Sequence, residues 1–85
     1  MSKRVILGVQ VTNRTEHVPK VQNVLTQYGC NIKTRLGLHE VSEKICSTVG
    51  LLIIETCGPE AQVSEMEQNL KKIPGVVVKK MVFIE

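Results

Sequence analysis

Residues 45–56 read ICSTVGLLIIET, and this segment predicts the central strand of a β-sheet. Between Val49 and Ile54 it is apolar at odd and even positions alike. Successive side chains of a strand point to opposite faces, so we expect this strand to be covered on both sides. The rest of the chain is interpreted around it.

Three further segments also have strand patterns. Residues 5–12 alternate between apolar and mixed positions, and residues 76–84 do the same at the end of the chain. Residues 30–39 alternate with one fully polar face, which is typical of a strand at the edge of a sheet. In that segment we expect three apolar side chains to share the other face: Ile32, Leu36 and Leu38.

Two segments predict amphipathic helices. The first lies between residues 18 and 28, with Pro19 expected in its first turn and Gly29 as a left-handed cap at its end. The second opens at Gly58-Pro59, with Pro59 as its first residue, and ends at Pro74-Gly75. Its apolar stripe consists of Val63, Met66, Leu70 and Ile73.

The predicted order is strand, helix, strand, strand, helix, strand, so residues 1–85 read as one domain of two βαβ units. Right-handed crossovers then give a ferredoxin-like α+β sandwich, with a four-stranded antiparallel sheet, the first and third strands central and both helices on one face. No segment remains to cover the other face, which would carry Ile6, Gly8, Val77, Met81 and Phe83, together with one apolar set from residues 49–54. An apolar face of this size predicts a homo-oligomer, a dimer or tetramer, with Ile6, Val77, Met81 and Phe83 in the interface.

Composition narrows the functional classes. The net charge is +3 and no more than two basic residues are adjacent, so we expect no strong DNA binding by the chain alone. No segment is long and apolar enough to cross a membrane, and no signal peptide is predicted, which favours a cytoplasmic protein. No acid–base or nucleophile set and no nucleotide or cofactor motif is found, so we expect a binding module rather than an enzyme.

Some residues are candidates for ligand or metal binding. The loop before the first helix contains Asn13 and Arg14, and a helix N-terminus attracts anions; helix capping is the alternative. Gly37 lies within a strand, where glycine marks a bulge or the close approach of a backbone or ligand. A hairpin pairing His39 with Cys46 would bring both within reach of one Ni²⁺, Zn²⁺ or Cu²⁺ ion, although such a site needs more ligands.

The remaining polar candidates have simpler explanations. Cys30 and Cys57 lie at strand ends, where a cysteine is usually a small, partly buried hydrophobic residue. Four basic residues fall on the expected edge strands, where lysine deters aggregation; an auxiliary contact with nucleic acid is the alternative. They are Lys33, Arg35, Lys79 and Lys80.

Three runs of residues resemble the small regulators of the iron-only hydrogenase system, over nearly the whole chain. The runs are Lys3-Arg4-Val5 to Asn13-Arg14, Tyr28-Gly29 to Arg35-Leu36-Gly37-Leu38, and Leu70 to Ile73-Pro74-Gly75-Val76 with Val78-Lys79. That family is similar to ACT domains and to the ligand-binding domain of the nickel-responsive repressor. The resemblance implies an oligomeric, ACT-like transcriptional regulator that senses a small molecule or works through a protein partner. A metal-responsive sensor using His39 and Cys46 is the alternative.

Overall fold

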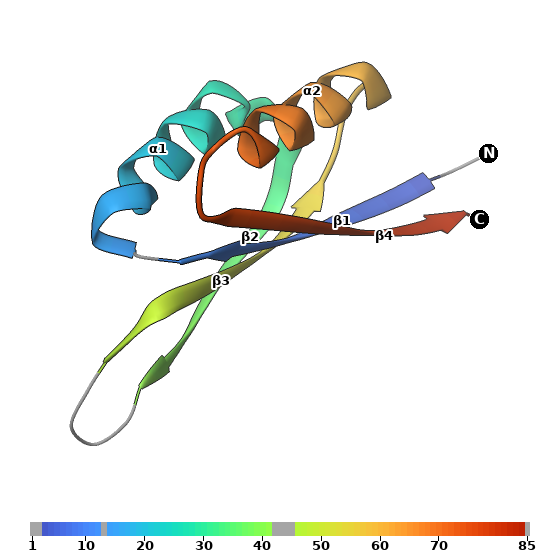
Figure 1. The fold of residues 1–85 in the computed structure, drawn as a ribbon. Helices are drawn as coiled ribbons and strands as arrows, with labels where there is room; N and C mark the ends of the chain where they lie inside the picture. Colours follow the sequence, from blue (N-terminus) through green and yellow to red (C-terminus); the bar gives the residue numbers. More distant parts are fainter. Residues whose placement is uncertain (1–2, 13, 42–45, 85) are drawn as a thin grey trace.

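The computed structural model describes residues 3–12, 14–41 and 46–84. Four strands and two α-helices follow one another in the predicted order (Figure 1). The elements are β1 (Lys3–Val11), α1 (Arg14–Gln27), a 3₁₀ turn (Gly29–Asn31), β2 (Ile32–Val41), β3 (Cys46–Thr56), α2 (Glu60–Lys71) and β4 (Val76–Ile84).

The four strands form one antiparallel sheet in the order β2-β3-β1-β4. Both helices lie on the same side of this sheet, and the ends of β1 and β4 project beyond α2 (Figure 1). The predicted ferredoxin-like fold is therefore confirmed, with β1 and β3 central and β2 and β4 at the edges.

The core lies between the sheet and the two helices. Leu7, Val9 and Ile54 are fully buried on the central strands, and Met66 and Leu70 are fully buried on α2. Each such side chain contributes about 1.5–3 kcal/mol to stability by leaving water. Of the two faces of the sheet, the core uses only the one under the helices.

The ends of the helices differ from the prediction at three residues. Helix α1 begins at Arg14, so Pro19 lies inside the helix, in the second turn, and cannot donate the backbone hydrogen bond due there. Gly29 is not a left-handed cap: it begins a 3₁₀ turn, and the positive φ angles in the described residues belong to Gly58 and Gly75. Pro59 has an extended ψ of 136° and is the N-cap of α2 rather than its first residue.

An irregularity near the start of β2 changes which face its side chains occupy. Ile32 pairs with Thr56, but Thr34 pairs with Glu55, so Lys33 is an extra residue in the strand. Ile32 therefore faces the helices, whereas Leu36, opposite Ile53, lies on the other face of the sheet. The expectation that Ile32 and Leu36 share a face was wrong because strict alternation cannot anticipate a bulge.

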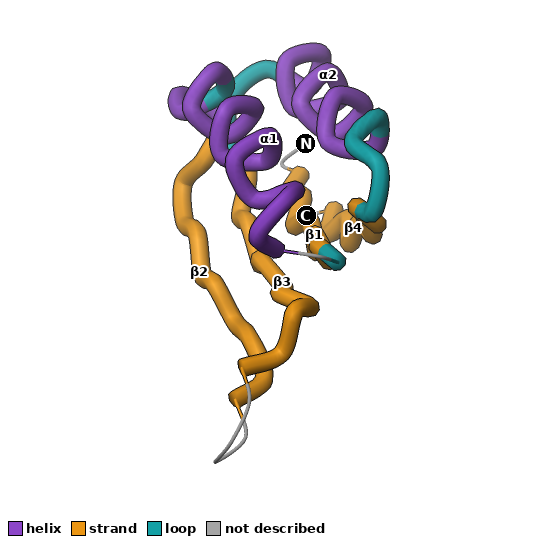
Figure 2. Tube along the Cα trace, turned by 60° about the vertical axis from the view of Figure 1, so that its left-hand side comes forward, coloured by secondary structure: helices purple, strands orange, loops and turns teal. Residues whose placement is uncertain are grey.

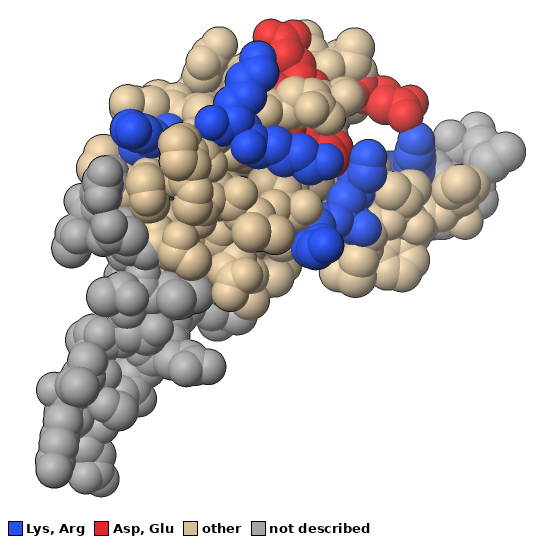
Figure 3. Space-filling model, viewed as in Figure 1, with Lys and Arg blue, Asp and Glu red and all other residues tan. Residues whose placement is uncertain are grey.

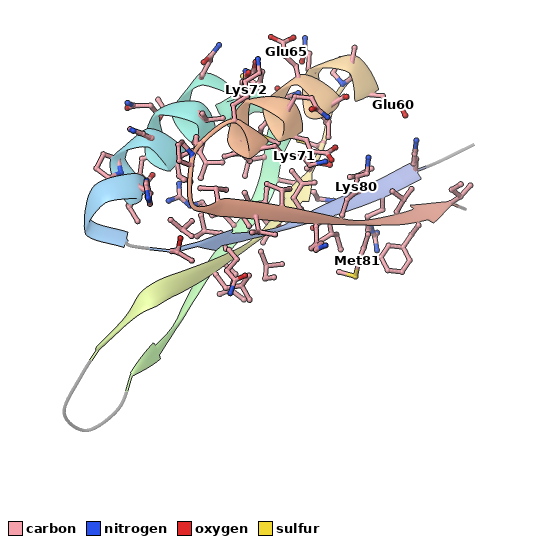
Figure 4. The ribbon with its side chains drawn as sticks, viewed as in Figure 1. Glu60, Glu65, Lys71, Lys72, Lys80 and Met81 are labelled. Atoms are coloured by element: carbon pink, nitrogen blue, oxygen red, sulfur yellow. The ribbon has the colours of Figure 1, made fainter. Side chains whose placement is uncertain are left out.

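A buried carboxylate ties α2 to β4. The side chain of Glu67 is 6% exposed, and its two oxygens lie 3.0 Å from Lys71 Nζ and 3.2 Å from Lys80 Nζ. Lys80 projects from β4 toward α2, whereas Met81 beside it projects away (Figure 4). Burial alone would raise the pKa of Glu67, but the hydrogen bonds from Lys71 and Lys80 outweigh it and hold the pKa below its ordinary value.

The Glu67→Gln variant tests this ion pair through its pH dependence. A carboxylate with a lowered folded-state pKa stabilises the protein above its unfolded pKa and ceases to do so as pH falls through the folded value. We expect the variant to lose about 1–2 kcal/mol of unfolding free energy at pH 7, because both lysines are partly exposed and solvent screens the attraction. This difference should begin to shrink as the pH falls below 4.5, the ordinary pKa of the group, and should be gone once the pH is below the lowered folded-state pKa.

Urea unfolding measured at several pH values gives both the loss of unfolding free energy at pH 7 and its dependence on pH. The matched control is Glu60→Gln on the same helix, where the carboxylate meets Lys3 in an exposed pair and should contribute little. Parallel wild-type and Glu67→Gln profiles over the whole pH range would contradict the assignment.

Candidate functional site

The candidate site is the face of the sheet that points away from the helices, which we call the outer face. Residues opposite one another in the antiparallel register point to the same side. Ile6 lies between Glu55 on β3 and Met81 on β4, and Gly8 lies between Ile53 and Lys79. The outer face thus includes Ile6, Gly8, Val77, Met81 and Phe83, as the sequence predicted. Leu51 and Ile53 are the expected apolar set from β3, and Leu36 is an addition.

Large apolar side chains on the outer face are half exposed. The exposed fractions are 53% for Leu36, 38% for Leu51, 47% for Val77, 52% for Met81 and 51% for Phe83. A monomeric protein rarely leaves so many neighbouring apolar side chains in water. Strand β3 is central, as predicted, but only its helix-side face is covered within one chain.

Polar residues are the minority on the outer face. Gln10 and Lys79 lie beside Gly8 in its middle, and the others lie toward one end. Arg4 Nε lies 3.4 Å from Glu55 Oε2, and the Thr34 hydroxyl donates a 3.3 Å hydrogen bond to Glu55 Oε1. Lysine and arginine side chains otherwise lie mainly over the helical layer and along β4, with glutamates between them, and the surface below is largely uncharged (Figure 3). The outer face is therefore suited to an apolar partner.

A second feature is the junction where β1 meets the loop before β4. Thr12 donates two hydrogen bonds to the carbonyl of Gly75, from its backbone N–H at 2.9 Å and from its hydroxyl at 2.8 Å. The His17 ring packs against Gly75, and its Nδ1 is buried without a hydrogen-bond partner among the described residues. Nothing in the sequence marks this contact of His17, because an isolated histidine in an amphipathic helix has no distinguishing pattern.

The predicted ligand residues are only partly placed by the structure. Asn13 lies outside the described residues, and Arg14 is the first residue of α1, with its side chain outside the description. Gly37 lies on β2, opposite Leu52 of β3. Strand β3 therefore separates Gly37 from β1 and from the loop that follows β1. Their role in binding a ligand stays a prediction.

The Gly75→Ala variant tests the junction. Gly75 has a φ of 80°, and a Cβ there would lie 2.8 Å from the His17 ring and from the Thr12 hydroxyl. Left-handed strain and overpacking together should cost about 2–4 kcal/mol of unfolding free energy. The measurement is chemical denaturation, with Gly29→Ala as the control, since a Cβ there meets nothing within 4 Å. Equal stability of the two variants would contradict this account.

The hairpin register differs from the one assumed for the metal site. Gly50 lies opposite His39, and Val41 lies opposite Cys46, with an irregularity between these pairs. His39 and Cys46 are therefore not cross-strand partners, because the two strands pair with another offset than the sequence suggested. Their side chains lie outside the description, so metal binding by His39 and Cys46 stays a prediction. Within the described part of the chain, no three His, Cys, Asp or Glu side chains come together.

The ladder of β2 and β3 continues into a polar cluster at the start of α2. Cys57 N–H donates to Asn31 O at 2.9 Å, and the buried Asn31 amide donates to Cys57 O at 3.2 Å and Gln62 Oε1 at 3.0 Å. The Cys57 thiol lies 3.4 Å from the Cys30 carbonyl. Cys30 is exposed rather than partly buried as expected, and Cys57 is half-buried. This cluster closes the end of the sheet.

The solved structures most relevant to this fold include three proteins. The uncharacterized protein TM1266 from Thermotoga maritima is 21% identical with a TM-score of 0.81, and the match covers 98% of this chain and 100% of that one. CPII, a nitrogen regulatory PII-like protein from Thiomonas intermedia K12 solved with ADP, AMP and bicarbonate, is 13% identical with a TM-score of 0.55, covering 99% and 96%. A formyltetrahydrofolate deformylase from Pseudomonas putida KT2440 is 11% identical with a TM-score of 0.57, covering 92% of this chain but 28% of the enzyme.

The sequence itself matches one family. The model of the TM1266-like family, described as "Iron-only hydrogenase system regulator, putative", matches residues 3–80. No curated protein shows significant sequence similarity to the chain. The described helices include none that is long and apolar enough to span a membrane.

Proposed function

Because the chain belongs to the TM1266-like family of iron-only hydrogenase system regulators, we propose that it is a non-enzymatic regulatory module that acts in the cytoplasm as a homo-oligomer. One observation carries the proposal: the outer face exposes neighbouring apolar side chains that its own helices do not reach. A second copy of the chain, packed face to face, would bury them.

The exposed surface area of the chain is consistent with a second copy as the partner that covers the outer face. The chain exposes 5759 Å², whereas a compact protein of its mass exposes about 5,000 Å². The β2–β3 pair extends beyond both helices (Figure 2), so this excess is not the area of the outer face alone. It is of the same order as the roughly 800 Å² that each partner buries in a standard interface. Because the same patch meets itself in a two-fold dimer, a closed dimer is the simplest assembly, and a tetramer requires a further contact.

The second part of the proposal is that the oligomer responds to a small effector. CPII has the same fold and is described as a nitrogen regulatory protein bound to ADP, AMP and bicarbonate, which supports a sensing role on this fold. In this chain the junction of Thr12, His17 and Gly75 offers a buried imidazole nitrogen beside the start of α1. We place the effector response there and the assembly on the outer face.

Substitutions on the outer face test the assembly. Replacing Met81 and Phe83 together with Glu would place two charges where we expect apolar contacts, and should convert the oligomer to monomers at micromolar concentration. Light scattering coupled to size exclusion measures the mass. The control is Gln68→Glu at an exposed position of α2, away from the outer face, and it should leave the wild-type mass unchanged. A wild-type mass of a single chain would contradict the proposal.

A binding measurement tests how regulation reaches its target. With a net charge of +3 and no groove-reading helix or ribbon predicted, the isolated protein should bind duplex DNA weakly and without sequence preference. We therefore propose that transcriptional regulation passes through an effector or a protein partner. Fluorescence anisotropy at physiological salt checks this, and nanomolar, site-specific binding would favour a direct repressor instead.

A further inference from the structure

Gly8 occupies the middle of the outer face. It lies on the central strand β1, with Ile53 of β3 on one side and Lys79 of β4 on the other. Ile6 and Gln10 are its neighbours along the strand on the same face. Because glycine has no side chain, the backbone of β1 is bare at this point.

The fold of one chain does not require glycine at position 8. Its φ is not among the positive values, and a Cβ there would meet only Lys79 O, at an ordinary 3.9 Å, among the described atoms within 4 Å. Gly58 and Gly75 differ, since both have positive φ and a Cβ would lie 2.9 and 2.8 Å from neighbouring atoms. Glycine weakens a strand when nothing requires it, and it commonly marks the close approach of another molecule.

The outer face also carries apolar side chains that could seat against this bare backbone. Leu36, Met81 and Phe83 are each about half exposed on the same face, and the exposed Lys79 lies directly beside Gly8. The face therefore presents both a position without a side chain and exposed apolar side chains, an arrangement that a self-complementary two-fold interface can use. Buried contacts near the centre of an interface contribute most to affinity.

We propose that Gly8 is the central contact of the homodimer, where an apolar side chain of a second copy seats against the bare backbone of β1. This inference rests on the proposed assembly through the outer face and adds the residue that sets how closely the two sheets approach. A side chain at position 8 would hold the sheets apart without disturbing the single chain.

The Gly8→Val variant tests the proposal, with Gln10→Val as the matched control on the same strand and face. Sedimentation velocity over a concentration series gives the dissociation constant, and circular dichroism gives the fold and melting of each chain. We expect Gly8→Val to remain folded and to melt no lower than the wild type at concentrations where both are monomeric. Its dissociation constant should rise at least tenfold, against less than threefold for Gln10→Val.

The outcomes separate this inference from the proposed function. A wild-type oligomer whose affinity is unchanged by Gly8→Val overturns the role of Gly8 and leaves the assembly standing. A wild type that is monomeric throughout overturns both. If the valine variant does not fold, Gly8→Ala decides instead: at least threefold weaker assembly supports the proposal, and unchanged assembly overturns it.

Discussion

In the part of the chain that the structure describes, two helices cover one face of a four-stranded sheet and leave the other face uncovered. The distribution of apolar residues over the two faces follows from this arrangement. Beneath the helices Leu7, Val9 and Ile54 are fully buried against α2 and α1. On the opposite face the same strands carry Ile6 and Ile53, which are partly exposed, and Leu51, which is exposed. A strand with apolar residues on both faces is expected in a sheet covered on both sides, and this is why we propose that a second copy covers the outer face of β3.

Polar interactions hold the helices in place on the covered face of the sheet. Glu67 draws Lys71 and Lys80 together and joins α2 to the edge strand β4. Thr12 and Gly75 connect the end of β1 to the start of β4, and Asn31 connects the start of β2 to α2. These contacts lie around the helical layer, so the outer face can meet a partner without losing any of them.

Much of the fold could be predicted from the sequence, because hydrophobic periodicity reports which side of a strand is buried. The bounds of β4 followed from alternation, the central position of β3 from its apolar residues on both faces, and the uncovered face from the order of the elements. The extra residue at Lys33 could not be predicted, since a bulge leaves no mark in the pattern, and it moved Leu36 onto the outer face. The offset that pairs His39 with Gly50 likewise depends on the turn and on both strands together. The junction around His17 depends on Gly75, 58 residues away in sequence, which no local motif connects to it.

The most direct test of the central claim is the oxidation rate of Met81 by hydrogen peroxide, measured by mass spectrometry over a range of protein concentrations. Met81 is half exposed on the outer face of one chain, whereas Met66 is fully buried beneath the helices and serves as the internal reference. Burial of the outer face between two copies predicts that Met81 reacts almost as slowly as Met66 at high concentration and becomes reactive on dilution. A Met81 that reacts rapidly at every concentration would contradict it.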